Sequence, residues 1–143
     1  MKKLLVVGVF LLGIGIGVML VNMQMSVVTS QKAMFSVVSP DEIREMAIVR
    51  YEDNANAAVT DKAVIDQIID DLSGMELRRE NGHPPVGDYG IWVYSTAGEL
   101  LGMELYKSGE YLRVNTSKHG NKVYKVLNGK DFLRTIEGLE WNK

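Results

Sequence analysis

An unbroken apolar run near the amino terminus places the strongest constraint on what this chain can form. The run extends from Leu4 to Val21 and has 18 residues, none of which is charged or carries a hydrogen-bonding side chain. As a helix rising about 1.5 Å per residue it would be roughly 27 Å long, close to the thickness of a membrane hydrocarbon core. The sequence therefore predicts a membrane anchor at residues 1–21, formed by a transmembrane helix.

A cleaved secretory signal is the alternative, because such signals also place basic residues before an apolar segment. Their apolar region usually has about 7–15 residues and ends at small residues that mark the cleavage site. The run here is longer, and the nearest segment of that kind, Val28-Thr29-Ser30, lies well beyond its end. The chain has no cysteine, so a lipid-modified amino terminus of the lipoprotein type is excluded.

The distribution of basic residues predicts the orientation of the anchor. Lys2 and Lys3 precede the apolar run, whereas the first basic residue after it is Lys32. Because basic residues stay on the cytoplasmic side of a membrane, we expect a single-pass protein of the cell membrane. Its amino terminus would be cytoplasmic and its carboxy-terminal domain would lie outside.

The composition changes at residue 39. Residues 22–38 carry one charge and no Gly or Pro, which predicts a juxtamembrane linker. Residues 39–143 contain 13 basic and 18 acidic side chains, a net charge of -5, and are numerous enough for one compact core. We expect them to form an extracytoplasmic domain, and their acidic balance argues against nucleic acid as a partner.

The first half of this domain shows a strand, a turn and a helix. Ile43 to Tyr51 is rich in β-branched residues towards its end and predicts a strand, after which Ala57 to Thr60 pairs back briefly. Thr60-Asp61 then predicts a helix start, with a hydroxyl cap followed by an acid in the first turn. Apolar residues recur at helical spacing as far as Leu72, and Gly74 predicts the end of the helix.

The second half predicts a sheet of hairpins and a last helix. Four short β segments are separated by turns of hairpin size: Ile91–Thr96, Leu100–Tyr106, Tyr111–Asn115 and Lys122–Val126. The last helix would be capped by Asn128 and Asp131 and would bury four apolar side chains: Phe132, Leu133, Ile136 and Leu139.

The predicted fold class is α+β, with the element order β-α-β-β-β-β-α behind the transmembrane helix. Two helices on one face of an antiparallel sheet of four or five strands would bury every apolar stripe in two layers. This order is similar to that of the TATA-binding-protein-like fold.

With these elements placed, residues 43–139 resemble a known group of domains. The resemblance rests on the capped helix Val59-Thr60-Asp61-Lys62-Ala63-Val64-Ile65, with Ile68, Ile69 and Leu72, followed by hairpins. In these features the chain resembles small extracytoplasmic domains of unknown function from Gram-positive bacteria, which follow a signal or anchor segment. The resemblance implies a location and a fold, and it supplies no catalytic residue.

The residue types exclude several chemistries. Without cysteine there is no thiol catalysis and no thiolate metal site. The two histidines, His83 and His119, do not lie in a metal-spaced motif, and no nucleophile motif accompanies them. Asp66 and Asp70 share a helix face that we interpret as solvated. We therefore expect no metal site, no cofactor and no catalytic residue.

The stretch from Arg78 to Gly90 is the best candidate for a binding site. Its 13 residues exceed what a hairpin connection needs, and Pro84-Pro85 would stiffen it and lower the ordering cost of binding. Its polar and aromatic contact candidates are Arg79, His83, Asp88 and Tyr89.

Together these features predict a membrane-anchored, extracytoplasmic binding or interaction module that is not an enzyme. Its expected partners are the membrane, through Leu4 to Val21, and a protein of the cell envelope. The alternative is a secreted protein released by signal cleavage, which acts as an enzyme or inhibitor on cell-envelope substrates.

Overall fold

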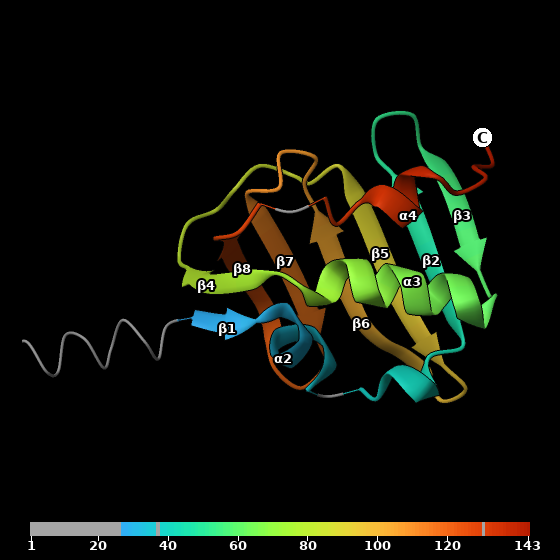
Figure 1. Ribbon diagram of the computed structural model, residues 1–143, viewed down its shortest axis with the longest axis horizontal. Coiled ribbons are helices and arrows are strands. Elements are labelled where there is room, and N and C mark those ends of the chain that lie inside the picture. The colour runs from blue at the N-terminus through green and yellow to red at the C-terminus, as the bar shows by residue number, and fades with distance from the viewer. Residues whose placement is uncertain (1–26, 37, 130) are drawn as a thin grey trace, which may run out of the picture.

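A computed structural model describes residues 27–36, 38–129 and 131–143 (Figure 1). This part of the chain forms an eight-stranded sheet in the order β1-β4-β8-β7-β6-β5-β2-β3, in which every pair of neighbours is antiparallel. The strands are β1 (Val27–Thr29), β2 (Glu45–Arg50), β3 (Ala55–Val59), β4 (Glu76–Glu80), β5 (Tyr89–Ser95), β6 (Gly98–Leu105), β7 (Tyr111–Thr116) and β8 (Gly120–Val126). The helices are α2 (Ser30–Phe35), η1 (Pro40–Glu42), α3 (Lys62–Ser73) and α4 (Arg134–Glu137).

Helices α2, α3 and α4 lie on the same face of the sheet, which we call the covered face (Figure 1). Strand residues alternate accordingly, so that Leu101, Met103 and Leu105 of β6 are buried against the helices. From the helix layer, Ile68 and Leu72 of α3 are fully buried in the same core. The predicted two-layer α+β architecture with an antiparallel sheet is thus confirmed, and so are the four hairpin strands of its second half.

The prediction of a long irregular stretch from Arg78 to Gly90 was wrong. Strand β4 occupies its first part and pairs with both β1 and β8, and β5 begins at Tyr89. Only Leu77 of the five β4 residues is buried, because β4 is next to the edge of the sheet and its charged side chains reach solvent. With one apolar position, a strand has no alternating pattern to detect. The connection is therefore limited to residues 81–88.

The described part of the predicted linker belongs to the packed domain. Strand β1 pairs with β4, and Met34 of α2 is fully buried. The Ser30 hydroxyl is buried, donates to the Leu72 carbonyl and accepts from Met75 N at 3.1 Å. These contacts join α2 to the end of α3, so the domain begins earlier than residue 39. The observed element order adds β1, α2, β3 and β4 to the predicted one, and the sheet has eight strands rather than the four or five predicted.

The helix ends agree only partly with the sequence signals. The Asp61 carboxylate, rather than the Thr60 hydroxyl, caps α3 by accepting from Ala63 N at 2.8 Å, and Gly74 ends the helix as predicted. Helix α4 is one turn long and has no side-chain cap. The Asn128 amide, predicted as its cap, instead donates to Gly74 O at 2.8 Å and accepts from Glu76 N at 2.7 Å.

The predicted anchor, Leu4 to Val21, lies outside the described residues. Within residues 27–36, 38–129 and 131–143, no helix is long and apolar enough to cross a membrane.

Candidate functional site

The four residues predicted to form a binding site do not form one cluster. Arg79 and Tyr89 lie in one row across the sheet, in which Tyr124, Leu112 and Leu105 separate them. Four strand spacings of about 4.8 Å put their backbones roughly 19 Å apart. The Arg79 guanidinium lies 5.8 Å from the ring centre of Tyr124, and the buried Tyr89 ring lies 6.0 Å from that of Trp141.

His83 and Asp88 lie in the connection between β4 and β5, where they have different roles. His83 is exposed, and no hydrogen bond from its side chain to another described residue is formed. The Asp88 carboxylate accepts from Lys107 N at 2.7 Å, and its carbonyl accepts from Tyr51 N at 2.9 Å. Asp88 therefore holds this connection against two neighbouring turns, which is a structural use of the side chain.

A hollow on the opposite side of the sheet from the helices is a better candidate. It has a volume of about 240 Å³ and opens on the face that the helices leave uncovered, which we call the open face. Its lining comes from the β2–β3 turn and strands β5 to β8: Tyr51, Trp92, Glu99, Gly102, Met103, Glu104, Arg113, Asn115 and Asn121. Pockets for drug-sized molecules usually measure roughly 300–1,000 Å³, so this hollow suits one small ring of a longer ligand.

Two aromatic side chains lie on glycines inside the strands of the open face. A Cβ at Gly90 would lie 2.9 Å from Cζ of Tyr51 and 2.8 Å from Cη2 of Trp92. A Cβ at Gly102 would meet the indole of Trp92 at an ordinary 3.8 Å. Glycine inside a strand weakens the sheet but permits such close approach, so Gly90 is what allows the ends of the two side chains to lie against the backbone. Both residues are only partly buried.

Polar groups beside the two rings have unused hydrogen-bonding capacity. Glu104 Oε2 lies 2.8 Å from Nη1 of Arg113, in an ion pair that lacks hydrogen-bond alignment, and Nε of Arg113 is buried without a partner. Asn115 and Asn121 are register partners on β7 and β8, and both are exposed. The hollow therefore offers aromatic surface surrounded by two carboxylates, a guanidinium and two amides.

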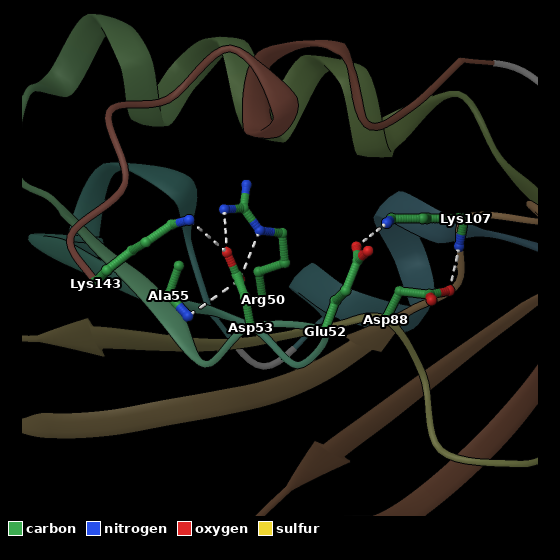
Figure 2. A network of polar contacts seen from close by, with 7 residues as sticks. All are labelled: Arg50, Glu52, Asp53, Ala55, Asp88, Lys107 and Lys143. Atoms are coloured by element: carbon green, nitrogen blue, oxygen red, sulfur yellow. Dashed lines mark hydrogen bonds and ion pairs between the residues drawn. The ribbon is translucent and has the colours of Figure 1, made fainter.

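A network of ion pairs fixes the turn that carries Tyr51 (Figure 2). On one side of Tyr51, Arg50 donates twice to Asp53, at 2.9 and 2.8 Å. On the other side, Lys107 donates to Glu52 at 2.7 Å. The preceding and following residues are thus both anchored, and Tyr51 is positioned over the sheet without an ion pair of its own.

These contacts shift several pKa values. The hydrogen bonds from Arg50 hold the pKa of Asp53 well below its usual range, and those from Lys107 lower the pKa of Glu52. Burial raises the pKa of the Tyr51 hydroxyl, which therefore remains a protonated donor at the edge of the hollow. Among the described residues, no group of three His, Asp or Glu side chains could hold a metal ion.

Sequence signals for this hollow are weak. Gly102 stands inside the predicted strand Leu100–Tyr106, where an isolated glycine indicates a bulge or a close approach, whereas Gly90 ends the stretch that was predicted to be irregular. The residues that form the hollow lie between positions 51 and 121, and only the strand register brings them together.

The fold defines a class, a two-layer α+β domain with one covered and one open sheet face. No family model and no curated protein matches the chain. In structure the chain is similar to a solved protein described as "Putative Lipoprotein from Clostridium perfringens", with 14% sequence identity and a TM-score of 0.49. The similarity covers 72% of this chain and 83% of the other.

Proposed function

We propose that this protein is a membrane-anchored, extracytoplasmic binding module without enzymatic activity, and that the open-face hollow binds one ring of a saccharide. The observation that carries the proposal is the pair of Tyr51 and Trp92, which pack over Gly90 beside polar groups with free hydrogen-bonding capacity. A pyranose ring has an apolar face of C–H groups and a rim of hydroxyls. Its face would stack on the aromatic rings, and its hydroxyls would bond to the surrounding amides and charges.

The anchored form is supported by the contacts of β1 and Ser30. Cleavage after Val28-Thr29-Ser30 would remove β1 and separate the Ser30 hydroxyl from Leu72 and Met75. An intact amino-terminal segment keeps these contacts. Mass spectrometry of the amino terminus after cell fractionation tests this part: a mature chain that starts near Gln31 and is found in the medium would refute the anchor.

The ligand is tested by titrating the full chain with two neutral probes, N-acetylglucosamine tetramer and maltotetraose, and measuring the heat of binding by calorimetry. We expect saturable binding by the wild type and its loss in Trp92→Ala. Trp141→Phe is the matched control, because Trp141 packs against Tyr89 on the covered face and should not affect binding. The proposal is wrong if neither probe binds, or if Trp92→Ala binds as the wild type does.

A further inference from the structure

The charged side chains of the domain are divided unevenly along the sheet. In Val27–Phe35, Glu76–Glu80 and Tyr111–Val126, which form β1, α2, β4, β7 and β8, seven basic residues stand against two acidic ones. Residues 38–75 and 81–110 carry four basic and thirteen acidic side chains. The domain is acidic overall, yet the half that contains β1 is strongly basic.

The basic half is also the half whose cations lack partners. In the acidic half, three of the four cations form an ion pair, namely Arg50, Lys62 and Lys107, and only Arg44 has no carboxylate within 4.0 Å in the described structure. In the basic half, Arg113 is paired with Glu104, and the other six cations have no carboxylate within 4.0 Å in the described structure. We call these six the basic edge: Lys32, Arg78, Arg79, Lys118, Lys122 and Lys125. Five of them are exposed, and Lys122 is half-buried.

The arrangement of the basic edge does not stabilise the folded domain. Arg78 and Lys125 are direct register partners on β4 and β8, and like charges opposite each other destabilise a sheet. Lys32 and Lys122 line a hollow of about 180 Å³ between α2 and the sheet, together with His119 and without any acidic residue. Such a concentration of cations indicates an anionic partner.

Two further features favour the membrane itself as this partner. The predicted anchor ends at Val21, and β1 starts at Val27 at one end of the sheet (Figure 1). At about 3.6 Å per residue at most, this connection reaches roughly 22 Å. Val27 and Leu127, two large apolar side chains exposed by 42% and 40%, lie on this same edge. The basic edge is therefore tethered close to the headgroups.

We propose that the basic edge contacts the phosphates of anionic phospholipids in the membrane that anchors the chain, which rests on the anchor of the proposed function. Each basic side chain near an anionic surface strengthens association about fivefold, and the tether supplies a high effective concentration. Strand β2, in the acidic half, lies six strand spacings from β1, roughly 29 Å, beyond the screening length of about 8 Å at physiological salt. The domain would thus stand on its basic edge, with the acidic half turned away.

The test uses the full chain in nanodiscs of phosphatidylcholine, with and without phosphatidylglycerol. Because the chain has no cysteine, Ser117→Cys places a single fluorophore in the β7–β8 turn of the basic edge. Ala58→Cys places one on β3, at the opposite edge of the sheet, as a control. Nitroxide groups on the lipid headgroups quench a fluorophore that comes close to them. We expect quenching at position 117 that requires phosphatidylglycerol and disappears in high salt, and little quenching at position 58.

A charge variant makes the test specific. Replacing Arg78, Lys118, Lys122 and Lys125 by Gln should weaken docking on the order of several hundredfold if their effects add. The matched variant Arg44→Gln with Lys62→Gln, which removes two exposed cations of the acidic half, should dock as the wild type does. Thermal melting checks that each variant is folded.

The outcomes separate the two proposals. Equal quenching with and without phosphatidylglycerol overturns the headgroup proposal. Quenching that is unchanged in the variant with four Gln substitutions overturns it as well. A chain that does not remain with phosphatidylcholine nanodiscs overturns the anchor and the headgroup proposal together. Docking of the wild type on anionic nanodiscs, together with no binding of either saccharide probe, leaves the headgroup proposal supported and refutes only the ligand of the hollow.

Discussion

The covered and open faces of the sheet come from alternate residues of the same strands, yet they meet different requirements. On β6, Leu101, Met103 and Leu105 are buried in one continuous core. Between them on the open face stand Gly102 and Glu104, which contribute little apolar burial. The open face also contains a glycine under two rings and a buried Arg113 Nε without a partner, and both features lower stability. The covered face therefore accounts for folding, and the open face requires another explanation, which we take to be binding.

The largest expected effect contrasts one residue from each side of the sheet. Ile68→Ala removes a fully buried side chain of α3 and should lower the free energy of unfolding by about 2–5 kcal/mol. Trp92→Ala, on the open face, should lower it by less, about 1–2 kcal/mol, since the side chain is only partly buried. Urea denaturation of both variants measures the difference. A Trp92→Ala cost equal to that of Ile68→Ala would make the open face part of the core and remove the contrast.

The next effect concerns the amino-terminal segment formed by β1 and α2, which packs against the end of α3. Ser30→Ala leaves the buried Met75 N without its acceptor and should cost about 1–3 kcal/mol. Thr29→Ala is the matched control, because its hydroxyl accepts only from the exposed Lys32 N, at 3.3 Å. Urea denaturation compares the two. Equal stability of Ser30→Ala and the wild type would restore the view that this segment is a linker.

The covered face could largely be predicted from the sequence, because its determinants are local and periodic. Ile65, Ile68 and Leu72 recur at helical spacing, and Gly74 ends the helix. The hairpins from residue 89 to residue 126 alternate apolar and polar side chains between turns that contain glycine. In these segments local propensity, pattern and fold agree.

The open face and the basic edge could not be predicted in the same way, because they depend on pairings between distant segments. Strand β4 has one buried side chain, and β1 has three residues, so neither has a periodic signal of its own. Tyr51 and Trp92 meet only because β2 pairs with β5. The prediction instead selected the polar residues of one connection, in which Asp88 supports the structure and Arg79 lies at the far side of the sheet.

A smaller effect separates the two glycines of the open face. A Cβ at Gly90 would collide with the end of the Tyr51 ring and with Trp92, whereas at Gly102 it would make ordinary contacts. Both colliding groups are the far ends of side chains that can move. Gly90→Ala should therefore displace the rings and reduce saccharide binding at least about tenfold, while it lowers stability by only about 1 kcal/mol. Gly102→Ala should reduce saccharide binding and stability less than Gly90→Ala does. Fluorescence titration and urea denaturation compare the two variants. Equal saccharide binding by both would mean that the two rings are not part of the binding site.

The smallest effect tests whether the ion pair between Arg50 and Asp53 positions the Tyr51 ring, which belongs to the same turn between β2 and β3. Hydrogen bonds from Arg50 lower the pKa of Asp53 in the folded state, so this carboxylate stabilises the fold above its unfolded pKa of about 3.8. That contribution is lost as the pH falls below this value towards the lower folded pKa. Asp53→Asn should therefore lower the melting temperature slightly near neutral pH, and the difference from the wild type should shrink in acid.

Asp131→Asn is the control for this effect, because Asp131 meets Arg134 at 3.6 Å on an exposed surface away from the turn. If the network positions Tyr51, Asp53→Asn also weakens saccharide binding near neutral pH, whereas Asp131→Asn does not. High salt should reduce the effect on the melting temperature, since the paired side chains are partly exposed. Unchanged binding in Asp53→Asn would mean that Gly90 and Trp92 alone hold the ring in place, and that the open face is organised independently of the charges at its end.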